Sequence, residues 1–393
     1  MRGQVAELDW SAWQAALKPY ASVPRDDAQQ LFNDAQLKIG RFSGFGSTLD
    51  NLSVQLKRAS AAWALSLDSQ LLKGRVDLPD AASAPIAVNL DYLRLPAAEP
   101  KGAVVEDKPD ALASVDPRQI PALDVRIAQV MQGTQPLGGW SLKARPNATG
   151  VLFNDLNLDL KGLQVTGSAG WQGTPGASGS WYKGRLQGKD LADVLLAWGF
   201  APTASSESFY LDIDGRWPGS PAWISLKRFS GRMDASLRKG QFSEVQGSAS
   251  ALRVFGLLNF NSIGRRLRLD FSDLFGRGLS YDRVKGLLVA TDGVFVTREP
   301  ITLTGPSSNL ELNGTLDMAD QMINAKLLVT LPVSNNLPLA ALIVGAPAIG
   351  GALFVVDKLL GDRVARFASV QYDVKGALQS PNITFDKPFE KPR

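Results

Sequence analysis

The chain has 393 residues, of which 45% are hydrophobic and 20% are charged, so it can bury a sizeable core and is too apolar for a disordered polymer. It contains no histidine and no cysteine, which excludes Ser-His-Asp triads, thiolate nucleophiles, disulfides and His/Cys metal sites. The net charge is +4, but the basic and acidic residues are interspersed. The sequence therefore lacks the basic stripe expected of a nucleic-acid-binding protein.

Apolar residues alternate with polar ones in many short segments from one end of the chain to the other. Because successive side chains of a strand point to opposite faces, this period predicts strands with one apolar face and one wet face. Few segments are long enough to be crossover helices, and Asp292-Gly293 is a strong hairpin signal. The sequence predicts a mainly β, antiparallel fold. The clearest alternating segments are 52–56, 63–67, 86–90, 123–127, 156–160, 209–213, 267–271, 310–312, 327–331 and 370–374.

A degenerate internal repeat runs through the chain. Residues 42–78 and 131–171 share the order of a glycine-containing turn, an alternating strand, a polar turn and a strand with Lys-Gly, and residues 284–316 give a looser third copy. Repeats of this size are typical of an elongated stack in which each unit buries its apolar face beside its neighbours.

Helical patterns are few. Asp9 to Leu17 places Trp10, Trp13 and Leu17 on one side, and Asp190 is a suitable N-cap for a short helix that carries apolar residues as far as Trp198. Each is expected to plug the end of a sheet. The segment 97–119 is rich in Ala, Pro, Lys, Asp and Glu without periodicity, and it reads as an exposed linker or loop.

An uncharged run extends from Leu337 to Val356 and contains two prolines and three glycines. Its length is close to the roughly 20 residues that span a hydrocarbon core, but the prolines favour a broken helix pair. Asp357 to Phe367 continues in a helical pattern. The run is compatible with a buried cap of the sheet and equally with a tip that contacts a membrane.

Several ordered motifs resemble the C-terminal region of the YhdP family of AsmA-like envelope proteins. The family's Leu-Phe-Asn-Phe-Asn-like segment falls on 258–261, its Arg-Arg-Leu-x-Leu-Asp-Phe-Ser-Asp-Leu-Phe core on 265–275 and its Gly-aromatic-Asp pattern on 278–282. Trp217-Pro218-Gly219-Ser220-Pro221 and the apolar stretch with Asn336-Leu337-Pro338-Leu339, 345–351 and 358–361 also fit. The resemblance covers residues 120–385 and is looser before them.

The resemblance implies a periplasmic, bridge-like lipid-transfer protein that carries phospholipid between the inner and outer membranes of a Gram-negative envelope. Its sheet would curl lengthwise into an apolar groove, an AsmA-like β-taco, with a C-terminal helical tip toward the outer membrane. Since Met1 leads directly into Arg2-Gly3-Gln4, we expect the inner-membrane anchor of that family to precede this portion in a longer chain. The expected domains are 1–96 (β-repeat region), 97–119 (linker), 120–335 (β-groove), 336–368 (broken-helix tip) and 369–393 (final strands and tail).

The amphipathic strands offer more apolar surface than the few expected helices can cover. A second sheet, closure into a barrel, or an open trough filled by acyl chains would each cover it, and the resemblance favours the trough. The expected lipid-facing residues are Leu158, Leu160, Ile213, Leu269, Phe271, Leu312 and Val329, and the expected membrane-tip residues are Leu339, Leu342, Ile343, Ile349, Leu353 and Phe354.

The basic cluster Arg265, Arg266 and Arg268 is a weak candidate for phosphate headgroups, because alternation places the last two on the wet face. Catalysis by paired carboxylates is not expected, since Asp212 and Asp214 alternate on the solvent side of one strand. No cofactor or metal is predicted, and the partner is phospholipid. An envelope scaffold or outer-membrane assembly factor without transported cargo fits the same composition.

Overall fold

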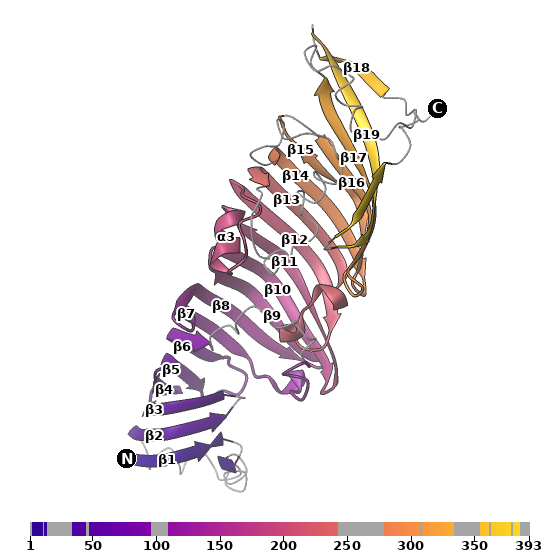
Figure 1. Ribbon diagram of the computed structural model, residues 1–393. Helices are drawn as coiled ribbons and strands as arrows, with labels where there is room; N and C mark the ends of the chain where they lie inside the picture. Colours follow the sequence, from indigo (N-terminus) through magenta and orange to yellow (C-terminus); the bar gives the residue numbers. More distant parts are fainter. Residues whose placement is uncertain are drawn as a thin grey trace. The chain divides into compact units, whose positions relative to one another are not determined.

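The computed structural model describes residues 2–10, 12–13, 34–44, 47–95, 109–242, 279–306, 309–333, 354–360, 363–378 and 380–385. Most of these residues lie in strands, which confirms the mainly β fold (Figure 1). The chain divides into two compact units. Unit 1 comprises Met1–Pro100, Ser114–Lys161 and Val165–Ser178, and unit 2 comprises Lys101–Ala113, Gly162–Gln164 and Gly179–Arg393.

Unit 1 is a sheet whose neighbouring strands follow one another in the chain. Most pairs are antiparallel, as expected, but β1 pairs with β2 and β6 pairs with β7 in parallel. The antiparallel meander was a wrong prediction at these two pairs, where connections longer than a hairpin allow the chain to return in the same direction. The strands are β1 (Arg2–Asp9), β2 (Asp34–Gly44), β3 (Ser47–Arg58), β4 (Ala62–Asp68), β5 (Leu72–Pro79), β6 (Ile86–Leu95), β7 (Leu123–Gln132), β8 (Gln135–Asn147), β9 (Gly150–Leu160) and most of β10 (Leu163–Thr174).

Unit 2 is an antiparallel sheet in which each strand from β11 to β17 pairs with the next. β17 then pairs with β19, whose other edge is covered by β18 and β20. The strands are β11 (Ala177–Gly188, from Gly179 onward in this unit), β12 (Ser208–Pro218), β13 (Ser230–Phe242), β14 (Leu279–Thr291), β15 (Val294–Thr304), β16 (Asn309–Asp317), β17 (Met322–Val333), β18 (Phe354–Leu360), β19 (Arg363–Ala377) and β20 (Asn382–Phe385).

Two local predictions are confirmed in unit 2. Asp292 and Gly293 join β14 to β15 with φ of 46° and 83°, the left-handed pair that a two-residue type I′ hairpin requires. Asp190 caps the helix α3 (Leu191–Ala197) by accepting a hydrogen bond from the Ala192 amide at 3.0 Å. In unit 1 the Asp9 carboxylate accepts from the Ala12 amide at 2.9 Å, and Trp10, Ala12 and Trp13 are helical; residues 14–17 lie outside the described part.

The helical pattern expected over Asp357–Phe367 is wrong. Residues 354–360 form β18 and residues 363–377 form β19, and the two strands pair from Phe354 with Ser369 to Leu360 with Arg363. The apolar spacing of this stretch fits either period. Valines at 355, 356 and 364 favour the strand, and the ladder between β18 and β19 supplies backbone partners that a helix would not use. The rest of the expected tip, 336–353, lies outside the described residues.

Candidate functional site: a continuous apolar sheet face

The strand register of unit 2 aligns apolar side chains into rows that cross the sheet. One row passes from Ile213 to Met233 and Leu288, and a second passes from Ile301 to Leu312 and Leu327. Since directly opposed residues share a face, each row is a continuous apolar strip. A third row extends furthest, and its members in strand order are Phe209, Leu237, Val284, Leu303, Leu310 and Val329.

Burial of this apolar face changes along the strands. Near the β14–β15 and β16–β17 turns the side chains are buried, with Phe295 and Leu316 only 3% and 2% exposed. Further along the strands burial is uneven: Leu303, Leu310 and Leu327 are 4%, 8% and 3% exposed, whereas other row members pack against the same cluster and remain only partly buried. A closed sandwich core would cover these residues as well, so the described protein leaves a strip of the face incompletely covered. The partly buried members are Ile213, Met233, Leu237, Val284, Leu288, Leu312 and Val329.

The connection between β12 and β13 folds over the buried end of the face. It carries the short 3₁₀ turns η3 (Pro221–Trp223) and η4 (Leu226–Arg228) and ends at Phe229, which is 1% exposed. The Phe229 ring stacks on Phe295 with centroids 5.9 Å apart, and a side-chain carbon on Gly215 would collide with it at 2.1 Å. Gly215 therefore makes room for the ring that closes this margin.

A carboxylate fastens the start of this connection. Asp110 accepts hydrogen bonds from the Ser220 amide at 2.7 Å and the Ser220 hydroxyl at 2.6 Å. The Trp217 indole donates to the Ser220 carbonyl at 3.0 Å. Partial burial acts to raise the pKa of Asp110, but the hydrogen bonds from Ser220 and the Leu112 amide, with the charge of Arg228, outweigh it and lower that pKa.

Helix α3 and the strand-like segment after it border the opposite end of the face. The Ser206 amide donates to the Asp190 carboxylate at 3.1 Å, and the Ser206 hydroxyl accepts from the Leu191 amide at 3.1 Å. The Tyr281 hydroxyl donates to the Ser205 carbonyl at 2.5 Å, and burial raises the pKa of Tyr281. Leu191 packs against the same apolar cluster as Ile213. Both ends of the strip are thus built by loops that are pinned through backbone hydrogen bonds.

An irregularity interrupts the ladder between β15 and β16 without changing the apolar face. Between the pairs Val296–Thr315 and Ile301–Leu312, β15 advances five residues while β16 advances three. Thr297, 8% exposed, satisfies the interrupted ladder: its hydroxyl donates to the Asn313 side chain at 2.5 Å and accepts from the Gly314 amide at 2.9 Å. Because β15 gains two residues here, an even number, Ile301 lies on the same face as Phe295.

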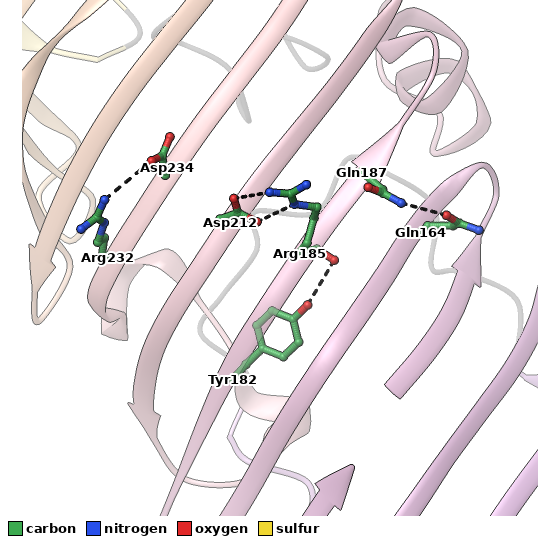
Figure 2. Close-up of polar contacts among 7 residues, drawn as sticks. All are labelled: Gln164, Tyr182, Arg185, Gln187, Asp212, Arg232 and Asp234. Atoms are coloured by element: carbon green, nitrogen blue, oxygen red, sulfur yellow. Dashed lines mark hydrogen bonds and ion pairs between the residues drawn. The ribbon is translucent and has the colours of Figure 1, made fainter. Parts of the chain in front are cut away.

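The other face of the same strands is charged, and its charges are paired across the ladder. Arg185 of β11 binds Asp212 of β12 at 2.6 Å (Figure 2). Lys183 of β11 likewise binds Asp214 of β12 at 3.1 Å. The Arg185 hydrogen bonds lower the pKa of Asp212. Both carboxylates named above as an improbable catalytic pair are therefore engaged in half-exposed ion pairs, and such pairs hold register more than they add stability.

Further polar contacts continue this charged face in Figure 2. Arg232 lies 3.7 Å from Asp234 on β13, and the Gln187 amide donates to Gln164 at 3.2 Å. Tyr182 differs from its neighbours: it is 8% exposed, its hydroxyl donates to the Arg185 carbonyl at 3.3 Å, and burial raises its pKa to about 12. The described residues contain no group of carboxylates that could hold a metal ion.

Unit 1 repeats the same design. One row of directly paired residues crosses the strands from β4 to β9. Its members in strand order are Leu67, Gly74, Leu90, Ile127, Trp140 and Leu158. The Trp140 indole donates to the Asp159 carbonyl at 3.0 Å, which fixes the ring beside Leu158. Leu158 therefore ends an apolar row and is half-buried, as is Leu160.

The structure locates five of the seven expected lipid-facing residues. Ile213, Leu312 and Val329 belong to the partly covered strip of unit 2, while Leu158 and Leu160 lie in unit 1. Leu269 and Phe271, and the headgroup candidates Arg265, Arg266 and Arg268, fall outside the described residues. So do the tip residues Leu339, Leu342, Ile343, Ile349 and Leu353, and of Phe354 only the backbone, in β18, is described.

The sequence analysis missed the residues that shape the margin. Phe229 lies between the second 3₁₀ turn and the start of β13 rather than in an alternating segment, so periodicity gives no signal for it. Met233, Leu237 and Leu288 were also missed. β13 is interrupted by Gly231, by Lys239 with φ of 41° and by several charged residues, so its alternation is weak. Only the register with β12 and β14 reveals that these side chains continue the rows.

Comparison with known proteins adds a relative of stated function. The chain is 26% identical over 233 residues to the "Intermembrane phospholipid transporter YhdP" of Escherichia coli (strain K12). The match covers 59% of this chain and 18% of the relative, so the chain spans less than a fifth of that protein's length. No solved structure matches the chain. No helix of the described residues is long and apolar enough to cross a bilayer.

The family assignment rests on nearly the whole chain. The family model described as YhdP protein matches residues 1–383, which include both units and almost every strand. This match agrees with the motifs at 217–221 and 258–282 and with the apolar strand rows. The chain belongs to the YhdP family.

Proposed function

We propose that this chain carries phospholipid in the envelope of a Gram-negative cell, with the acyl chains on the apolar sheet face and the headgroup in water. The observation that carries the proposal is the strip of unit 2 that includes Ile213, Leu312 and Val329, which is aligned across neighbouring strands and only partly covered. The relative named as an intermembrane phospholipid transporter supports the same cargo.

The dimensions of the strip favour movement over fixed binding. Adjacent strands lie about 4.8 Å apart, so the eight strands from β11 to β17 and β19 cover roughly 34 Å. One leaflet of a bilayer core, and hence one acyl chain, is roughly 15 Å thick. A lipid is therefore shorter than the face, and since apolar contact is non-directional it can shift along the rows without breaking a specific bond.

The energetics also suit transfer. Moving a 16-carbon chain into water costs on the order of 12 kcal/mol at about 0.8 kcal/mol for each CH₂ group. An apolar face that accepts the chain removes most of this barrier and needs no chemical step. Periplasmic location, passage between inner and outer membranes, and contact with the outer membrane through 336–368 are parts of the same proposal. The function is not enzymatic.

Photo-crosslinking in cells tests the proposal. We expect a photoreactive amino acid at position 213 or 312 to capture phospholipid, identified by mass spectrometry. Crosslinkers at Asp214 and Glu311 are matched controls, because each is exposed and is the chain neighbour of a test position on the opposite face. Equal capture at all four positions, or none at 213 and 312, would favour the envelope scaffold without cargo.

A further inference from the structure

Two arginines stand directly opposite each other on the charged face of unit 2. In the register of β13 and β14, Arg238 pairs with Arg283, and both are exposed. Like charges in directly opposed positions destabilise a sheet. On the same face Lys183 and Arg185 each oppose an aspartate, and the like-charge pair Asp212–Asp234 has its carboxylates bound by Arg185 and Arg232. The arrangement at Arg238 and Arg283 therefore needs a counter-charge.

Lys285 extends the pair, two residues along β14 from Arg283 and also exposed. We call Arg238, Arg283 and Lys285 the basic cluster. Within the described residues none of the three forms an ion pair. Two nearby carboxylates are engaged with other basic residues: Glu207 lies 3.3 Å from Lys239, and Asp234 lies 3.7 Å from Arg232. Asp282 and Glu299, the other exposed carboxylates beside the basic cluster, form no ion pair with it.

A buried hydroxyl adjoins the basic cluster. Ser236 pairs directly with Lys285, lies two residues from Arg238 and is 1% exposed. Its oxygen has no hydrogen-bond partner among the described residues. A buried hydroxyl without a partner is costly, but at 1% exposure this one lies beneath the basic cluster, out of reach of a lipid surface, and takes no part in the contact proposed below.

We propose that the basic cluster binds the phosphate groups of an anionic lipid surface. Guanidinium groups match phosphate geometry with two parallel hydrogen bonds, and clustered basic residues bind anionic membrane surfaces. The phosphate supplies the counter-charge that the opposed arginines lack. This contact lies on the face that does not hold acyl chains, so it is a membrane-docking site separate from the proposed lipid path.

Vesicle binding by the full chain tests the proposal. The probes are vesicles of phosphatidylcholine with and without phosphatidylglycerol, and inorganic phosphate in a separate titration. The test variant is Arg238→Gln/Arg283→Gln/Lys285→Gln. The matched control, Lys183→Gln/Arg232→Gln/Lys375→Gln, removes the same charge from unit 2 at residues that are ion-paired.

We expect binding to the phosphatidylglycerol vesicles only, a loss on the order of 100-fold in the test variant, and little loss in the control. Equal losses of vesicle affinity in the test and control variants would overturn the proposal. It would also be overturned if the test variant no longer bound inorganic phosphate but still bound the vesicles. If the triple variant misfolds, the single variant Arg283→Gln replaces it, and its affinity for the phosphatidylglycerol vesicles should fall about fivefold. The amount of phospholipid that co-purifies with the test variant should equal that of the unmodified chain. This measurement distinguishes a failure of the docking site from a failure of the proposed function.

Discussion

Replacement of Phe229 by alanine tests whether its ring closes the buried margin of the apolar face. The ring is 1% exposed, stacks on Phe295 at 5.9 Å and occupies the space above Gly215. Truncation of a buried phenylalanine costs about 3–5 kcal/mol. Because Gly215 has no side chain to fill the space, we expect Phe229→Ala to lie at the upper end of that range.

Hydrogen exchange followed by mass spectrometry measures this effect locally, which suits a chain of two units. We expect amides of β12, β13 and β15 to lose protection, because Phe229 packs on Phe295 and Gly215 and its carbonyl accepts from the Gly293 amide at 3.0 Å. Strands β3 to β6 of unit 1 should be unchanged. Leu226→Ala is the control, since Leu226 belongs to the same connection but is 46% exposed, and it should change stability by under about 0.5 kcal/mol. Equal effects of the two variants would refute the assignment of Phe229 as the closing residue.

Two other variants probe the polar contacts. The folded-state pKa of Asp110 is lowered, so its hydrogen bonds with Ser220 stabilise the fold at pH values above the unfolded pKa of about 4. This stabilisation is lost as the pH falls through the folded-state pKa. Asp110→Asn should therefore reduce the loss of stability at acid pH, and an unchanged dependence on pH would contradict this. Arg185→Gln should lower the free energy of unfolding by under about 1 kcal/mol, because the Arg185 and Asp212 side chains are 45% and 42% exposed. Urea titration measures this change. Leu327→Ala, at a position 3% exposed, serves as the reference and should lower the free energy of unfolding by about 2–5 kcal/mol. A loss for Arg185→Gln larger than about 1 kcal/mol would show that the ion pair does more than hold register.

Period-two alternation was sufficient to predict strands, because each strand of these sheets has one apolar and one wet face. It correctly assigned Ile213, Leu312 and Val329 to the apolar side, and the Asp-Gly signal located the β14–β15 turn. It could not predict the parallel return of β7 beside β6, since direction depends on the path of the connection. The error at 357–367 has a related cause: an apolar spacing that fits both periods is decided by strand pairing, here that of β18 with β19.

Register, which sequence periodicity does not contain, decides which residues act together. Ile213 and Met233 become neighbours only because β12 and β13 pair at Leu211–Ala235 and Asp212–Asp234. On the charged face the Arg185–Asp212 ion pair helps fix the register of the adjoining strands β11 and β12. A slip of one residue would move the rows to the wet face. The ion pairs therefore matter less for their own modest energy than for keeping the apolar rows unbroken, which is the property that the proposed movement of lipid requires.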